Sequence, residues 1–111
     1  MRAITLDPGQ MSARLELEIR DDVSDGQGGV VTGFSVLTSL WARIEPVSSG
    51  HGERAGEQVF AVTHRIWIRF RDDLAAGMRF RRGLRIFAVR AFRDPDETGR
   101  YLVCDCTEEG R

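Results

Sequence analysis

The sequence predicts an all-β protein: a small β-barrel of five to six mainly antiparallel strands with one long mobile loop. Three observations predict it. Apolar and polar residues alternate with a period of two in several stretches, whereas the longer period of an amphipathic helix is poorly represented. Turns rich in glycine and aspartate separate these stretches. The chain has only 111 residues, and closing so few strands into a barrel removes most exposed sheet edges.

The first predicted strand spans residues 13–20. Leu15, Leu17 and Ile19 point to one face, and the charged residues between them point to the other. The polar, glycine-rich segment 21–29 follows. Its composition suits an exposed loop or a wide hairpin.

The second predicted strand, residues 30–47, is long and is expected to bend near Gly33 or Ser39. Its inward row is apolar: Leu40, Ala42 and Ile44. Its outward row carries aromatic and charged side chains: Trp41, Arg43 and Glu45. Pro46 has no backbone N–H to donate, so we expect strand pairing to stop there.

The next segment, residues 48–58, is predicted to be the mobile loop because it has glycines and no aliphatic stripe. It comprises Ser48, Ser49, Gly50, His51, Gly52, Glu53, Arg54, Ala55, Gly56, Glu57 and Gln58. The clearest strand then runs from about residue 58 to residue 71. Its inward row is Phe60, Val62, His64, Ile66, Ile68 and Phe70. Its outward row is Thr63, Arg65, Trp67, Arg69 and Arg71.

A meander completes the predicted barrel. We expect a short strand at 78–80, a tight turn at 81–83, a strand at 84–91, and a turn at 93–99. The last strand, residues 100–107, carries three apolar side chains on one side: Leu102, Cys104 and Cys106. Neither a repeat nor a domain boundary is visible, so residues 1–111 are expected to form one domain.

The composition is that of a soluble globular domain, because 41% hydrophobic and 30% charged residues argue against wholesale disorder. The apolar runs are far shorter than the roughly 20 residues that span a bilayer, so no membrane partner is expected. The N-terminus lacks the apolar core of a secretion signal. We therefore expect the chain to be folded and assembled in the cytoplasm.

Catalysis is not predicted. The sequence contains no nucleophile elbow, zinc-protease motif, phosphate loop or dinucleotide fingerprint, so no catalytic, metal or cofactor site is expected. Cys104 and Cys106 are interpreted as small buried residues, and His64 as a hydrogen-bonded structural histidine. His51 is interpreted as a solvated loop side chain. Three carboxylates near the last turn are interpreted as part of a solvated turn rather than a cation site: Asp94, Asp96 and Glu97.

The net charge of −1 conceals an uneven distribution along the chain. Residues 1–64 carry five Arg and nine Asp or Glu, residues 65–93 nine Arg and two Asp, and residues 94–111 two Arg and six Asp or Glu. The three segments therefore have net charges of −4, +7 and −4. All sixteen basic residues are arginines, which form bidentate pairs with carboxylates or phosphates.

Three interpretations of the basic segment remain open. It could bind nucleic acid, with Trp67 stacking on bases and arginines neutralising phosphates, although a dedicated binder is usually net basic. It could be a subunit interface that meets acidic segments of a neighbouring copy. It could also be a solvated strand face whose charges pair within the barrel. The residues expected at a subunit interface are Arg65, Trp67, Arg69, Arg71, Trp41 and Arg43.

The order of these features resembles a known family, the head–tail joining proteins of long-tailed bacteriophages. These are stopper-type head–tail connectors, which also occur in prophages and gene transfer agents. The resemblance covers about residues 13 to 106 and is carried by the first strand and by five further segments. These are Leu40-Trp41-Ala42-Arg43-Ile44-Glu45-Pro46, residues 63–71, Gly77-Met78-Arg79-Phe80, Leu84-Arg85-Ile86-Phe87 and Asp94-Pro95-Asp96-Glu97.

The resemblance implies a β-barrel without catalytic residues that works inside a virion or virus-like particle. Copies would form a ring between the portal or adaptor protein of the capsid and the tail terminator or tail tube protein. DNA would pass through the ring without sequence-specific contacts. By position, residues 48–58 correspond to the loop that reaches into the channel in this family and helps retain DNA. Its charges, Glu53, Arg54 and Glu57, suit a movable gate better than a rigid plug.

Overall fold

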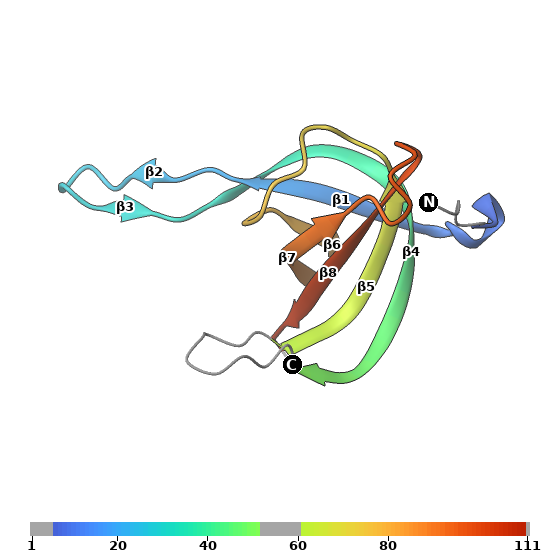
Figure 1. Cartoon of the computed structure of the whole chain (residues 1–111). Coiled ribbons are helices and arrows are strands. Elements are labelled where there is room, and N and C mark those ends of the chain that lie inside the picture. The colour runs from blue at the N-terminus through green and yellow to red at the C-terminus, as the bar shows by residue number, and fades with distance from the viewer. Residues whose placement is uncertain (1–5, 52–60, 111) are drawn as a thin grey trace.

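The computed structural model describes residues 6–51 and 61–110, with side chains for 6–47 and 61–110. Six antiparallel strands close a barrel in the order β1-β4-β5-β8-β7-β6 (Figure 1). They are β1 (Ala13–Arg20), β4 (Phe34–His51), β5 (Ala61–Arg69), β6 (Arg79–Arg82), β7 (Arg85–Arg93) and β8 (Tyr101–Glu109). β1 pairs with β4 along one edge in a long ladder. The barrel closes along the other edge of β1, where β6 pairs with it. The predicted all-β barrel is confirmed.

A two-stranded ribbon projects from the barrel on the left of Figure 1. It is formed by β2 (Val23–Ser24) and β3 (Val30–Val31), which continue β1 and β4 outward. Residues 21–33 are called the arm below. Of the two structures that the sequence allowed here, a loop or a wide hairpin, the chain adopts the hairpin.

The predicted second strand differs from the structure at both ends. Its beginning belongs to the arm, and β4 proper starts at Phe34 and continues to His51. Pairing with β5 is interrupted after Pro46, as expected from the missing donor, but it resumes at Gly50. The prediction of a loop from residue 48 onward is therefore wrong for the backbone of residues 48–51. The rest of the predicted loop, residues 52–58, lies outside the described residues.

The remaining boundaries shift by a few residues. The described part of the third predicted strand is β5, which ends at Arg69, so Phe70 leaves the inward row and is 45% exposed. The strand predicted at 78–80 extends through Arg82 as β6, and the tight turn moves to Gly83 and Leu84. Gly83 has a φ of 61°, a conformation that glycine adopts without the steric cost of a side chain.

Most residues of the predicted inward rows fill the barrel interior. The prediction is wrong at the end of β1, where the register shifts between Leu17 and Glu18, so that Glu18 is buried and Ile19 is only partly buried. The fully buried core residues come from every strand of the barrel: Leu15, Leu17, Ala42, Ile66, Ile68, Phe80, Phe87, Cys104 and Cys106. Burying a large apolar side chain stabilises the fold by about 1.5–3 kcal/mol, so this core accounts for much of the stability. Both cysteines are free thiols, and burial raises the pKa of Cys104 to about 12. The structural interpretation of the two cysteines agrees with this burial.

A second, smaller apolar cluster holds the N-terminal segment against the outside of the barrel. The 3-10 turn η1 (Pro8–Gln10) is capped by Asp7, whose carboxylate accepts a hydrogen bond of 2.9 Å from the Gly9 backbone N–H. Leu6 and Met11 on either side of this turn pack with Tyr101, and Trp67 lies against the same cluster. The outer face of β5 is therefore partly covered by the protein's own N-terminal segment.

His64 has the structural role that its position in the inward row predicts. Its ring packs edge-on against Phe87 with centroids 5.0 Å apart. Its Nδ1 lies 2.9 Å from the Thr63 hydroxyl, and its Nε2 lies 3.8 Å from a carboxylate oxygen of Glu108. A histidine held by a hydroxyl, a carboxylate and an aromatic edge is fixed in one orientation. The side chain of His51 is outside the described residues.

Candidate assembly surfaces

The basic segment is largely neutralised within the barrel. Glu18, buried on β1, accepts hydrogen bonds from Arg79 Nε at 2.6 Å and Arg81 Nε at 3.0 Å. Glu108 on β8 pairs with Arg85 at 2.8 Å. Because charged residues of opposite sign face each other across neighbouring strands, the segments of −4 and +7 net charge do not form separate surfaces.

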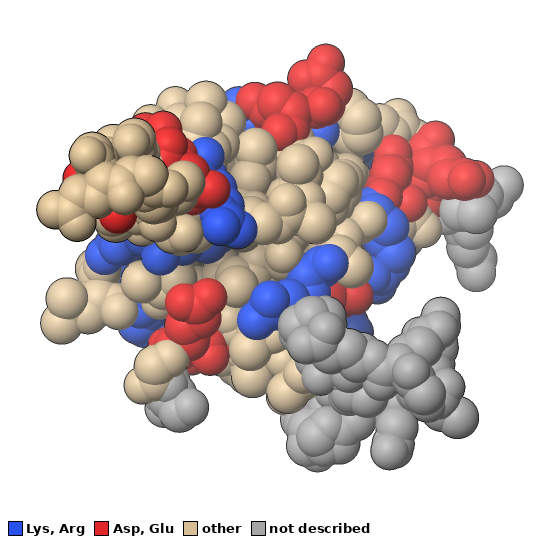
Figure 2. All heavy atoms as spheres, turned by 90° about the vertical axis from the view of Figure 1, so that its left-hand side faces the viewer, with Lys and Arg blue, Asp and Glu red and all other residues tan. Residues whose placement is uncertain are grey.

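Asp105 on β8 is a further acceptor for the basic segment. It lies 3.4 Å from Arg65 and 3.2 Å from Arg93. Figure 2 shows red and blue side chains close together on the face from which the arm projects, rather than one large patch of a single sign. Pairing within the barrel thus accounts for Arg65, Arg79, Arg81, Arg85 and Arg93. The interpretation as a subunit interface stays a prediction.

Four of the six predicted interface residues also have partners inside the subunit. Arg43 donates to Gln10 Oε1 at 3.0 Å, and Arg65 pairs with Asp105. Trp67 lies against the small N-terminal cluster, and its indole N–H is 3.4 Å from Glu45 Oε1. Arg71 is the fourth: it forms a two-point contact with Asp73, at 2.9 and 2.7 Å, which raises the pKa of its guanidinium. These contacts leave Trp67 poorly placed to stack on a base.

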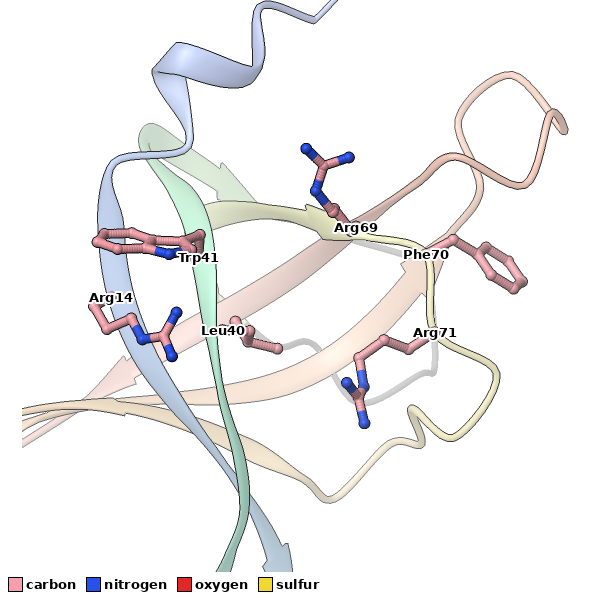
Figure 3. A pocket seen from close by; sticks show the side chains of 6 residues that line it. All are labelled: Arg14, Leu40, Trp41, Arg69, Phe70 and Arg71. Carbon is pink, nitrogen blue, oxygen red and sulfur yellow. The ribbon is translucent and has the colours of Figure 1, made fainter.

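The other two predicted interface residues, Trp41 and Arg69, border an open hollow. The hollow has a volume of about 230 Å³ and is called the Trp41 hollow below (Figure 3). Its lining comprises Arg14, Leu40, Trp41, Arg69, Phe70 and Arg71. The Arg14 guanidinium lies 5.1 Å from the centroid of the Trp41 ring, a cation–π contact that keeps the indole at the surface. Trp41 is 54% exposed.

The Trp41 hollow is lined by residue types that are common at protein interfaces. Trp and Arg are the residues most often found at the energetic centre of interfaces, because each offers a large contact area and a polar group. Figure 3 shows Leu40 between Trp41 and Arg71, with Phe70 turned outward at the rim. The sequence singled out Trp41 and Arg69 but not the hollow, because Arg14 and Phe70 reach it only through the β1–β4–β5 arrangement.

The arm is a second surface, which the predicted interface did not include. Val23 and Val31 are paired across its two strands and are 56% and 58% exposed. The turn of the arm is ordered by Asp25, whose carboxylate accepts the backbone N–H groups of Gln27 and Gly29 at 2.7 and 2.9 Å. These two bonds lower the pKa of Asp25. A sequence signal existed in the valines that flank the glycines, Val23 before them and Val30 and Val31 after them.

The carboxylates of the turn before β8 are used within the turn. Asp96 is buried and accepts hydrogen bonds from the Thr98 hydroxyl at 2.6 Å and from Arg100 at 3.0 Å. Asp94 accepts the Gly99 N–H at 2.7 Å. The prediction of a turn is confirmed, but Asp96 is not solvated, because these donors replace water.

The described residues offer no centre for metal chemistry. Within residues 6–47 and 61–110, no three side chains of His, Cys, Asp or Glu are placed to hold a metal ion. The same part of the chain contains no helix of the length and apolar character needed to cross a bilayer. The arm and the Trp41 hollow are the two exposed features described above.

Comparison with known proteins identifies the family. The family model described as "Phage head completion protein" matches residues 6–109, so the chain belongs to the phage head completion proteins. A chain in the structure "Virion of native gene transfer agent (GTA) particle" is 31% identical and has a TM-score of 0.61. The match covers 88% of this chain and 93% of that chain.

A second solved structure shares the fold. Protein SF1141 from Shigella flexneri 2a has a TM-score of 0.69 with this chain at 24% identity. The match covers 96% of this chain and 99% of that chain, and at this identity it shows the fold alone. No curated protein matches the chain. The resemblance to phage head–tail joining proteins that the sequence predicted is thus confirmed at the level of the family.

Proposed function

We propose that this protein is a structural head–tail connector of the stopper type, and not an enzyme. Copies form a ring between the portal or adaptor protein of a viral-type capsid and the terminator or tube protein of a tail. The ring continues the DNA channel. The observation that carries the proposal is the match to phage head completion proteins over residues 6–109. The likeness at 31% identity to a chain of a gene transfer agent virion supports the same particle context.

The distribution of charge is consistent with a channel protein. Packaged DNA has to move past the ring, and a strongly basic lining would bind its phosphates. Here most described arginines of the basic segment are paired with carboxylates of the same subunit. The carboxylates include Glu18, Asp105 and Glu108. The same pairing withdraws support from the alternative function, a barrel that binds nucleic acid directly through Trp67 and its neighbouring arginines.

Deleting the gene from a genome that encodes this chain tests the connector function. Electron microscopy of the particles should show filled heads and free tails that are not joined, and supplying the wild-type chain in trans should restore joined particles. Joined particles of normal number in the deletion strain would refute the proposal. Purified monomer should bind DNA weakly at physiological salt, whereas tight binding with a steep salt dependence would favour the nucleic-acid alternative.

The proposed channel loop, residues 48–58, can be tested separately. Because the backbone of residues 48–51 belongs to β4, the deletion should be confined to residues 52–58. Particles carrying this deletion should assemble but lose DNA on storage, measured as nuclease-sensitive DNA. Full DNA retention would remove the loop from the retention mechanism without affecting the connector assignment.

A further inference from the structure

The arm presents exposed apolar side chains on an ordered ribbon. Two-stranded ribbons are marginally stable in water, yet this ribbon is tied at its base and at its tip. Asp21 N–H donates to the Gly33 carbonyl at 2.8 Å, and Asp25 N–H donates to the Gly29 carbonyl at 3.1 Å. It presents the exposed Val23–Val31 pair on one face. A preformed ribbon with exposed valines loses little conformational entropy when it docks.

The arm also carries negative charge. Within residues 21–33 there are three aspartates and no basic residue: Asp21, Asp22 and Asp25. Arg20 at the base pairs with Asp22 at 3.0 Å, and Asp25 is occupied by the turn. The Asp21 side chain is exposed and has no ion-pair partner among the residues that the structure describes. A partner surface for the arm should therefore be apolar with adjacent positive charge.

The Trp41 hollow has this chemistry. Leu40 and Trp41 supply apolar surface, and the Phe70 ring is exposed at the rim. Of its three arginines, Arg71 is neutralised by Asp73. Arg14 and Arg69 are exposed, and neither faces a carboxylate at ion-pair distance within residues 6–47 and 61–110. These two guanidinium groups complement the acidic arm in sign.

The arm of a subunit does not reach its own hollow. Arg14 lies near the start of β1, and the arm continues from the end of the same strand. Val23 lies nine positions after Arg14 in the chain, which corresponds to roughly 30 Å of extended strand. Figure 1 shows β1 beginning beside the N-terminus on the right and leading into the arm on the left. The two complementary surfaces therefore lie toward opposite ends of β1, and they can meet only between two copies.

We propose that the arm of each subunit docks in the Trp41 hollow of the next copy, with Val23 and Val31 against Trp41 and with Asp21 facing Arg14 and Arg69. This inference rests on the proposed ring and names the contact between neighbouring subunits in it. The contact is head-to-tail, joining two different patches of the same chain, and repetition of such a contact closes a ring when the rotation allows it. The occupant of the hollow is a second copy of this chain.

Cross-linking within assembled particles tests the docking. The native thiols are buried, so a double variant Gln27→Cys and Phe70→Cys presents new reactive thiols at the arm tip and at the rim of the hollow. Treatment of particles with a short bismaleimide should give a ladder of multimers of this chain on denaturing gels. The matched control is Leu84→Cys with Phe70→Cys, because Leu84 is 97% exposed on the β6–β7 turn, outside the arm. The control should give no ladder.

A charge exchange provides a second, independent readout. Asp21→Arg and Arg69→Asp should each lower the yield of joined particles by about tenfold or more, since each places like charges in contact. The triple variant Asp21→Arg, Arg14→Asp and Arg69→Asp, which reverses every charge of the proposed contact, should restore the yield. Each isolated variant should retain the wild-type circular dichroism spectrum, because all three side chains are exposed.

The outcomes separate the docking from the proposed function. A cross-link from the arm to another particle protein, or no ladder in particles that assemble normally, would overturn the docking while leaving the connector function intact. Single charge variants with normal yield would overturn it as well. Joined particles in the complete absence of the gene would instead overturn the connector function.

Discussion

Replacing Glu18 by glutamine tests whether the barrel closure depends on a buried charge. The Glu18 side chain is 7% exposed and forms ion pairs with Arg79 and Arg81, whose side chains are 17% and 31% exposed. Glu18→Gln keeps the shape but leaves two arginines without their anion. Removing one partner of a buried ion pair lowers the free energy of unfolding by about 3–5 kcal/mol. Because water reaches both guanidinium groups in part, we expect a loss of about 2–3 kcal/mol in the free energy of unfolding.

Urea denaturation measures this loss. With a slope of about 1–3 kcal/mol/M, the midpoint should fall by about 1–2 M, while the slope itself stays unchanged. The melting temperature should fall by about 10 °C. Glu109→Gln is the control, because Glu109 is exposed at the end of β8, and its effect should stay within about 0.5 kcal/mol. Equal midpoints for the two variants would show that the Glu18 bridge does not stabilise the closure.

Three further predictions concern the core and the hollow. Phe87→Ala should cost about 3–5 kcal/mol in urea unfolding because Phe87 is fully buried, whereas Phe92→Ala, at a side chain that is 38% exposed, should cost less than half of that; similar losses would contradict the burial. Burial raises the pKa of the Cys104 thiol from 9.0 to about 12. Between these two pH values the thiol is ionised in the unfolded chain but not in the folded one, so its contribution to stability is complete below pH 9 and is lost as the pH rises toward 12. The native thiol should accordingly resist a thiol reagent at about pH 8 until urea unfolds the protein. Trp41→Ala should change the free energy of unfolding by less than about 1 kcal/mol but reduce the yield of joined particles, and a normal yield would exclude Trp41 from the interface.

The strands were predictable because their periodicity is local. Leu15 with Leu17 and Ile66 with Ile68 alternate with polar residues, and a period of two places each pair on one face of a strand whatever its neighbours are. The family resemblance was predictable for a related reason, because it depends on the order of such segments. Boundaries were less predictable: Phe70 continued the alternation in sequence, but β5 ends one residue earlier.

The charge pattern shows where sequence reasoning failed. Adding charges along the chain gave segments of −4, +7 and −4, which suggested separate basic and acidic surfaces. In the fold, Glu18 lies between Arg79 and Arg81, more than 60 residues away in the sequence. A sum over a segment ignores which strands become neighbours, and strand neighbours determine which charges pair.

The sequence by itself determined the all-β class, most of the inward rows of the barrel, the buried state of the two cysteines and the membership of a phage structural family. Each of these depends on residue types at short, fixed spacings. Only the tertiary structure decided which arginines are neutralised, where the Trp41 hollow forms, and that the arm and the hollow lie toward opposite ends of β1. These depend on the closing of β6 onto β1 and on the register of β4 with its two neighbours, because contacts between distant residues are set by strand pairing rather than by local periodicity.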